Sequence, residues 1–173
     1  MPLTTDLRLS LRGVLTGVAD FGSPTSQPDL TLAFSTADGT AAGQADIIWM
    51  EERTVASGAN DDIDLAPITN ALGASQTPVE IVGIILINAP KSGVANTTNL
   101  TLGVGTNPVT TAFLGGTSPT VGPIRPGGIF MIWNSDNAAG FGAVAAGTAD
   151  ILRIANAAGA AATYQIAFVG RSA

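Results

Sequence analysis

The stretch VEIVGIILINA, residues 79–89, decides the fold. Both sides of this stretch are apolar when the chain is extended, and the run is short and rich in β-branched residues. The pattern predicts a strand that is buried on both faces. Such a strand needs hydrogen-bonded neighbours at both edges.

Runs of similar length on either side of this stretch supply those neighbours. They alternate between apolar and polar residues or are apolar throughout, which is typical of strands. We expect strands at residues 6–15, 30–35, 46–55, 62–66, 100–104, 109–114, 129–133, 141–145, 151–155 and 164–169. Only residues 68–72 look helical, for one turn at most.

About ten short strands without a crossover helix predict an all-β chain folded as an antiparallel sandwich. Eight or more strands favour a jelly roll over a seven-stranded immunoglobulin-like sandwich. We expect one domain over residues 1–173, with an N-terminal strand or arm at 1–12. In that strand leucines alternate with Arg8, Ser10 and Arg12, which predicts a half-buried strand at a sheet edge.

The composition excludes several classes of function. Only 12% of the residues are charged, and 13 acidic against 7 basic residues give a net charge of −6, so a nucleic-acid partner is not expected. The chain has no cysteine and no histidine, which removes disulfides, thiol chemistry, the commonest zinc ligands and the commonest general base. No apolar run approaches the roughly 20 residues that span a bilayer, and no signal peptide is expected, so a membrane partner is not expected.

The densest acidic cluster is NDDID, residues 60–64. It has two interpretations, a calcium site and a solvated turn that enters a strand. The spacing lacks the central glycine and distal glutamate of a calcium loop, so we predict no metal site.

Glu51 and Glu52 could pair with Glu80 for glycoside chemistry, but the chain has only these three glutamates, and a solvated strand end is the better interpretation. Trp49, Trp133 and Tyr164 lie in predicted strands, where core packing is the default and a carbohydrate platform the alternative. We therefore predict no catalytic residue and no cofactor.

Several short motifs together resemble those of small virion proteins of tailed bacteriophages. They are TDLRLSL (5–11), ADIIW (45–49), DIDL (62–65), RPGG (125–128) and DILRIAN (150–156) followed by YQI (164–166). The resemblance implies a capsid decoration, or cement, protein with a jelly-roll or related fold. Such proteins sit as trimers on the outside of an icosahedral head between capsomers, and they have no catalytic residues.

The resemblance also implies partners and a location. The partners would be the major capsid protein and further copies of the chain, on the outer surface of a virion made in the host cytoplasm. We expect the contacts at the N-terminal strand and at a second loop, because terminal segments reach neighbours easily and arginine is enriched at interfaces. The expected contact residues are Leu3, Leu7, Arg8, Arg12 and Arg125.

Two other functions remain open at this point. A phage tail, baseplate or receptor-binding protein also uses trimeric β-sandwiches. A carbohydrate-binding module would need exposed aromatic side chains. An enzyme has the least support, because histidine and cysteine are absent and carboxylates are few.

Overall fold

The strand predicted at residues 79–89 forms as β9 (Glu80–Ile87), inside a four-stranded sheet. β9 pairs with β12 (Ile129–Trp133) on one edge and with β14 (Ala162–Arg171) on the other. Both edges are thus occupied, as a strand that is apolar on both faces requires. The computed structural model describes residues 2–18, 22–103, 105–117 and 119–173.

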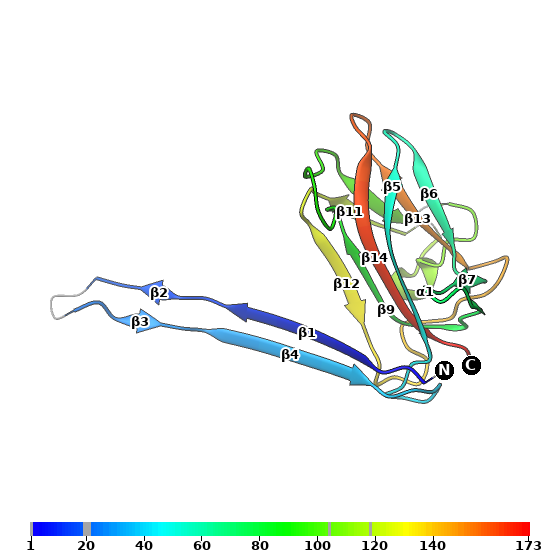
Figure 1. Cartoon of the computed structure of the whole chain (residues 1–173), viewed down its shortest axis with the longest axis horizontal. Helices are drawn as coiled ribbons and strands as arrows, with labels where there is room; N and C mark the ends of the chain where they lie inside the picture. Colours follow the sequence, from blue (N-terminus) through cyan, green and yellow to red (C-terminus); the bar gives the residue numbers. More distant parts are fainter. Residues whose placement is uncertain (1, 19–21, 104, 118) are drawn as a thin grey trace.

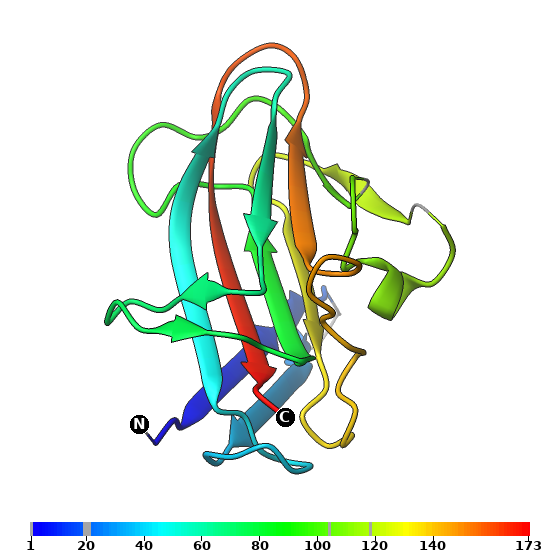
Figure 2. The same ribbon diagram turned by 90° about the vertical axis from the view of Figure 1, so that its right-hand side faces the viewer.

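Eight strands form two antiparallel sheets of four strands each. The first sheet has the order β12-β9-β14-β5 and the second the order β11-β10-β13-β6. Figure 2 shows the two layers, with β6 and β13 in front of β5 and β14. The remaining bounds are β5 (Ile47–Val55), β6 (Asn60–Asp64), β10 (Leu100–Gly103), β11 (Thr120–Ile124) and β13 (Ile151–Asn156).

The connections between these strands are those of a jelly roll. Successive strands alternate between the two sheets, except that β10 and β11 are neighbours in the second sheet. The two sheets enclose one core, in which Ile84, Phe168 and Tyr164 from the first sheet meet Leu102 and Leu152 from the second. The predicted all-β, antiparallel, jelly-roll-like sandwich is confirmed.

The remaining strands lie outside the sandwich. β1 (Thr5–Arg12) pairs with β4 (Asp29–Thr36), and β2 (Leu15–Thr16) pairs with β3 (Thr25–Ser26) further out along the same hairpin. We call residues 5–18 and 22–36 the arm. Figure 1 shows the arm leaving the foot of the sandwich, on the side of the first sheet, at a wide angle to its strands.

The arm corrects one prediction. The alternation at residues 6–15 predicts a half-buried strand, but most of β1 is exposed, and within the described residues its only strand partner is β4. Alternation shows that one face is apolar and does not show what covers it. The arm also continues beyond residues 1–12, because the returning strand β4 belongs to it.

Three local predictions are wrong. Residues 68–72 form no helical turn: β7 (Ile68–Thr69) pairs with β8 (Ser75–Gln76), and the Asn70 side chain accepts hydrogen bonds from the intervening turn. The strand expected at 109–114 is the helix α1 (Thr111–Leu114). The strand expected at 141–145 is reduced to isolated bridges.

Among the residues that the structure describes, no helix has the length and apolar character needed to cross a membrane.

Candidate interaction surface

One face of the arm is apolar along its length. The register of β1 and β4 places leucine and phenylalanine side chains opposite one another on the same side of the ribbon. The three pairs, from the sandwich outward, are Leu7 with Phe34, Leu9 with Leu32, and Leu11 with Leu30. We call these six side chains the apolar arm face.

The apolar arm face is open to solvent over most of its length. Leu11 is 64% exposed and Leu30 51%, while Leu9 and Leu32 are about as exposed as each other, at 41% and 40%. Contiguous exposed apolar surface is typical of an interaction site. Further out along the arm, the apolar side chain of Val18 is 99% exposed.

The opposite side of the arm is polar. Arg8 donates hydrogen bonds to Asp6, from Nη2 to Oδ2 over 2.8 Å, and Arg12 bonds the Gln27 side chain. These exposed contacts are worth little to stability. They show that Arg8 and Arg12 point away from the apolar arm face, so the two faces have different chemistry.

The base of the arm is packed against the sandwich. The buried hydroxyls of Thr5 and Thr36 form a hydrogen bond of 2.6 Å across β1 and β4. Next to them, the Phe34 ring lies against Trp133 of β12, with ring centroids 6.3 Å apart. The Leu3 side chain packs against a small cluster that includes Val169, and its N–H donates to Asp38 over 2.8 Å.

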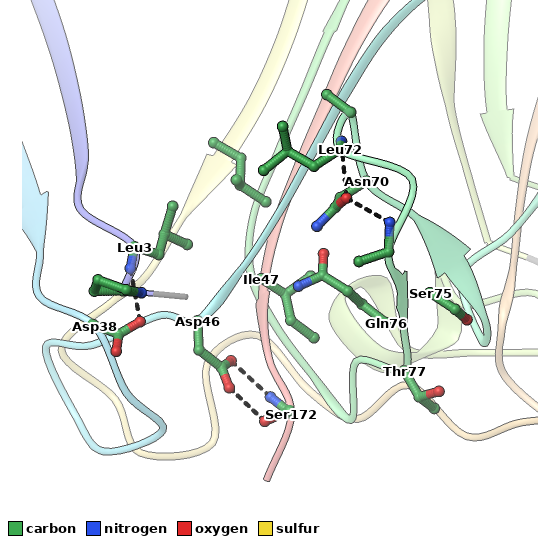
Figure 3. A pocket seen from close by; sticks show the side chains of 14 residues that line it. Leu3, Asp38, Asp46, Ile47, Asn70, Leu72, Ser75, Gln76, Thr77 and Ser172 are labelled. Atoms are coloured by element: carbon green, nitrogen blue, oxygen red, sulfur yellow. Dashed lines mark hydrogen bonds between the residues drawn. The ribbon is translucent and has the colours of Figure 1, made fainter.

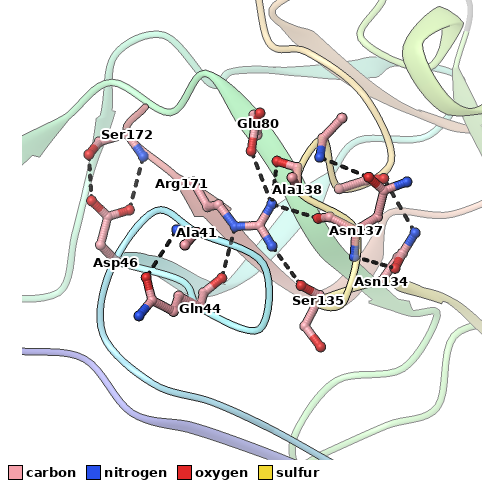
Figure 4. Close-up of polar contacts among 12 residues, drawn as sticks. Ala41, Gln44, Asp46, Glu80, Asn134, Ser135, Asn137, Ala138, Arg171 and Ser172 are labelled. Atoms are coloured by element: carbon pink, nitrogen blue, oxygen red, sulfur yellow. Dashed lines mark hydrogen bonds and ion pairs between the residues drawn. The ribbon is translucent and has the colours of Figure 1, made fainter.

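A buried arginine at this base forms hydrogen bonds with the surrounding loops (Figure 4). Arg171 is fully buried, and its guanidinium donates to Glu80 Oε2 over 3.0 Å and to the Ser135 carbonyl over 2.7 Å. It also donates to the carbonyls of Gln44, Asn137 and Ala138 over 2.9–3.0 Å. One cation thus connects the end of β14 to the segment that follows the arm and to the loop after β12. Nothing in the sequence pattern distinguishes this arginine from the other five.

The outer face of the first sheet is apolar as well. Paired strands place Met131, Ile85, Ala167 and Met50 in one row across the sheet, and the next row outward contains Ile129 and Ile87 beside Gln165 and Glu52. Met50 is 61% exposed and Ile129 66%. We call the surface formed by Met131, Ile85, Ala167, Met50, Ile129 and Ile87 the apolar sheet face. A shallow groove of about 510 Å³ runs along part of it. The outer side of a sandwich sheet is ordinarily polar, so this face is unusual.

A second groove, of about 870 Å³, opens beside the arm base (Figure 3). Its walls are Leu3 and Asp38 at the base, Ile47 of β5, and the β7–β8 hairpin with Leu72. Asp46 and Ser172 also line the groove, and the Asp46 carboxylate accepts a hydrogen bond from the Ser172 N–H over 2.9 Å. The groove is an open depression with a mixed lining, to which Asp38 and Asp46 contribute the charged groups among the described residues.

The acidic cluster at 60–64 is held by arginines. Arg53 donates two hydrogen bonds to Asp61, of 2.8 and 2.7 Å, and the buried Tyr164 donates to the same carboxylate over 2.6 Å. Arg53, and to a lesser extent Tyr164, lower the pKa of Asp61, against the opposing effect of burial. Burial and the bond to Asp61 raise the pKa of Tyr164. This network links the two sheets.

Three further carboxylates, those of Asp62, Glu51 and Glu80, also accept hydrogen bonds from arginines. Asp62 accepts two hydrogen bonds from Arg153, of 2.5 and 2.6 Å. Glu51 accepts from Arg53 over 2.7 Å, whereas Glu80 bonds Arg171 at the far end of the sandwich. In the described part of the chain, no three acidic side chains gather in a way that would hold a metal ion.

The residues predicted to contact partners fall in two separate places. Leu3 lies at the arm base, and Leu7, Arg8 and Arg12 lie on β1, with Leu7 alone on the apolar arm face. Arg125 is exposed in the turn between β11 and β12, at the end of β12 away from the arm base. The structure therefore brings three of the five onto one strand, places Leu3 beside the base of that strand and leaves Arg125 apart.

Sequence reasoning missed the return strand of the arm and the apolar sheet face. Leu30 and Leu32 carry the same alternation as Leu9 and Leu11, so that signal was present. The apolar sheet face could be inferred from residues 79–89, whose second apolar side has to be covered by something.

The aromatic residues considered for a carbohydrate platform do not form one. Trp49 and Tyr164 are buried in the core, and Trp133 is partly covered by Phe34. Comparisons of the chain with protein-family profiles, with curated proteins and with solved structures return no match.

Proposed function

We propose that the protein is a structural component of a tailed-phage virion. It binds the outside of the assembled icosahedral capsid and stabilises the shell as a decoration, or cement, protein, as a trimer between capsomers. Its partners are the major capsid protein and its own copies. It works without catalytic residues, cofactor or metal.

The observation that carries this proposal is the projecting arm. An isolated two-stranded hairpin is marginally stable in water, and this one exposes leucines along one side. Such an element is suited to a bound state in which another protein covers it. A sandwich that presents an arm is a scaffold for contacts.

The chemistry of the side chains supports the same function. Asp61 and Asp62 are bonded to arginines, and Glu80 is bonded to the buried Arg171. Carboxylates held in this way contribute to rigidity and are poorly placed for acid–base catalysis. The short motifs that resemble phage virion proteins point to the capsid as the surface that is bound.

The test uses phage heads that lack a decoration protein. Purified protein is mixed with expanded heads, unbound protein is removed by sedimentation, and the heads are imaged by electron microscopy. We expect saturable density on the outer shell, between capsomers, and a higher temperature of shell disruption. Absence of binding, or density only on tails, would overturn the proposal.

A further inference from the structure

Two apolar surfaces are left uncovered by the part of the chain that the structure describes. The apolar arm face exposes Leu9, Leu11, Leu30 and Leu32, and the apolar sheet face exposes Met50 and Ile129 among others. Exposed apolar surface of this extent on a soluble protein indicates an interface. Each surface needs an apolar partner. Because both surfaces are apolar, each can serve as the partner of the other.

The two surfaces of the same molecule cannot cover each other. The arm base is held by the Thr5–Thr36 hydrogen bond, by the packing of Phe34 on Trp133, and by the bond from Leu3 to Asp38. From this base the arm diverges from the first sheet (Figure 1). To lie on its own sheet, the arm would have to break these contacts.

We propose that the apolar arm face of one copy lies on the apolar sheet face of a second copy. One type of contact then covers both surfaces, whereas an unrelated partner would have to match each of them separately. The dimensions agree, because the eight residue pairs of β1 and β4 give a ribbon of about 26 Å at about 3.3 Å per residue, the same length as the eight-residue strand β9 of the sheet.

The size of this contact favours a closed assembly. Two strands about 4.8 Å apart and about 26 Å long cover roughly 250 Å² of flat surface, well below the roughly 800 Å² per partner of a stable interface. In a ring, each copy donates one arm and accepts another, so the area that each copy buries doubles to roughly 500 Å². Linked contacts also raise the effective concentration of each arm.

This inference rests on the proposed function only for the number of copies, three. Self-association and capsid binding are measured separately. Copies that associate through the arm but do not bind heads would overturn the capsid function and leave the arm contact standing.

Cysteine cross-linking tests the contact directly, because the chain has no cysteine of its own. One sample carries Leu9→Cys on the apolar arm face, and a second, of larger mass through a tag, carries Met131→Cys on the apolar sheet face. The two are mixed and oxidised with copper–phenanthroline. We expect a disulfide-linked product of one untagged and one tagged chain, formed at least tenfold faster than with Ser10→Cys, the adjacent residue on the opposite side of the arm.

A second pair of variants tests whether the apolar character of the arm face drives association. Leu9→Lys with Leu32→Glu places an ion pair at one register position of that face, and Ser10→Lys with Thr31→Glu places the same pair on the opposite face. Both variants keep a favourable cross-strand pair, so the hairpin is retained. We expect the first to raise the dissociation constant of self-association at least tenfold and the second to leave it within twofold.

Three results would overturn the inference. They are a monomer at all concentrations tested, equal cross-linking of Leu9→Cys and Ser10→Cys, and equal self-association of the two charge-pair variants.

Discussion

The ring of Phe34 in the arm lies against Trp133 of the sandwich, with centroids 6.3 Å apart and planes inclined at 36°. Trp133 in turn lies over Gly83 of β9, where a Cβ atom would come within 2.5 Å of the tryptophan ring. The central strand of the first sheet therefore sets the position of the tryptophan on which the arm rests. This contact joins the arm to the sandwich and determines the direction in which the apolar arm face is presented.

Replacing Phe34 with alanine should loosen the arm and leave the sandwich folded. Phe34 is half-buried, so its removal costs less than the roughly 3–5 kcal/mol of a fully buried phenylalanine. We expect the amides of β1 and β4 to exchange hydrogen at least tenfold faster, with little change in the core strands, measured by mass spectrometry. Phe168→Ala, in the core, is the matched comparison and should destabilise the whole molecule. Unchanged exchange in the arm would show that the aromatic contact does not hold it.

Gly83→Ala should act on the arm through Trp133. The added methyl group overlaps the tryptophan ring, so the ring has to move away from its place beside Phe34. We expect a change in tryptophan fluorescence and faster proteolysis of the arm. Gly13→Ala is the control, because a Cβ there meets Pro28 at an ordinary contact distance of 3.4 Å. Equal behaviour of the two variants would contradict the role assigned to Gly83.

The sequence predicts the sandwich well because its strands are apolar on one or both faces and short. β9 and β12 are recognisable as strands without any knowledge of their partners, since both are short apolar runs rich in isoleucine, although Ile129 of β12 remains 66% exposed. The patterns at 68–72 and 109–114 predict the wrong element because segments of five or six residues that mix apolar and polar positions fit either period. At α1, the side chain of Thr111 bonds the Pro108 carbonyl over 2.9 Å and favours the turn.

The candidate surface was predictable only in part. The alternation of Leu7, Leu9 and Leu11 identifies an apolar face, but the same pattern describes a strand on its own core and a strand that waits for a partner. Arg171 was not predicted at all. A buried guanidinium is recognised by the carbonyls around it, and those come from loops distant in the sequence.

Replacing Arg171 with leucine should destabilise the protein strongly. The change leaves Glu80 and several backbone carbonyls without their donor, and removal of one partner of a buried pair costs about 3–5 kcal/mol. The partial exposure of Glu80 places the expected value at the lower end. Urea unfolding measures this cost. Arg125→Leu, in an exposed turn, is the control and should change stability by less than about 0.5 kcal/mol. Equal stability of the two variants would refute the role of Arg171.

Stability should fall in acid partly through Asp61. Its bonds to Arg53 and Tyr164 lower its pKa in the folded state below the unfolded value of about 3.9. The stabilisation is therefore complete above that value and is lost as the pH falls through the folded pKa. Asp61→Asn should be less stable than the parent chain near neutral pH, and the difference should shrink in strong acid.

Urea unfolding between pH 6 and pH 2 checks this expectation. Asn60→Ser, at the adjacent position of β6, removes no titrating group, so its difference from the parent chain should not depend on pH. A difference for Asp61→Asn that stays constant into strong acid would mean that this ion pair does not contribute to acid sensitivity.

The central claim is that the apolar arm face is a contact surface between protein chains. Light scattering of the intact protein at micromolar concentration tests it most directly. The account predicts a mass three times the 17.3 kDa of one chain, and a single-chain mass for the Leu9→Lys/Leu32→Glu variant. A single-chain mass for the intact protein, or the same assembled mass for both proteins, would contradict it.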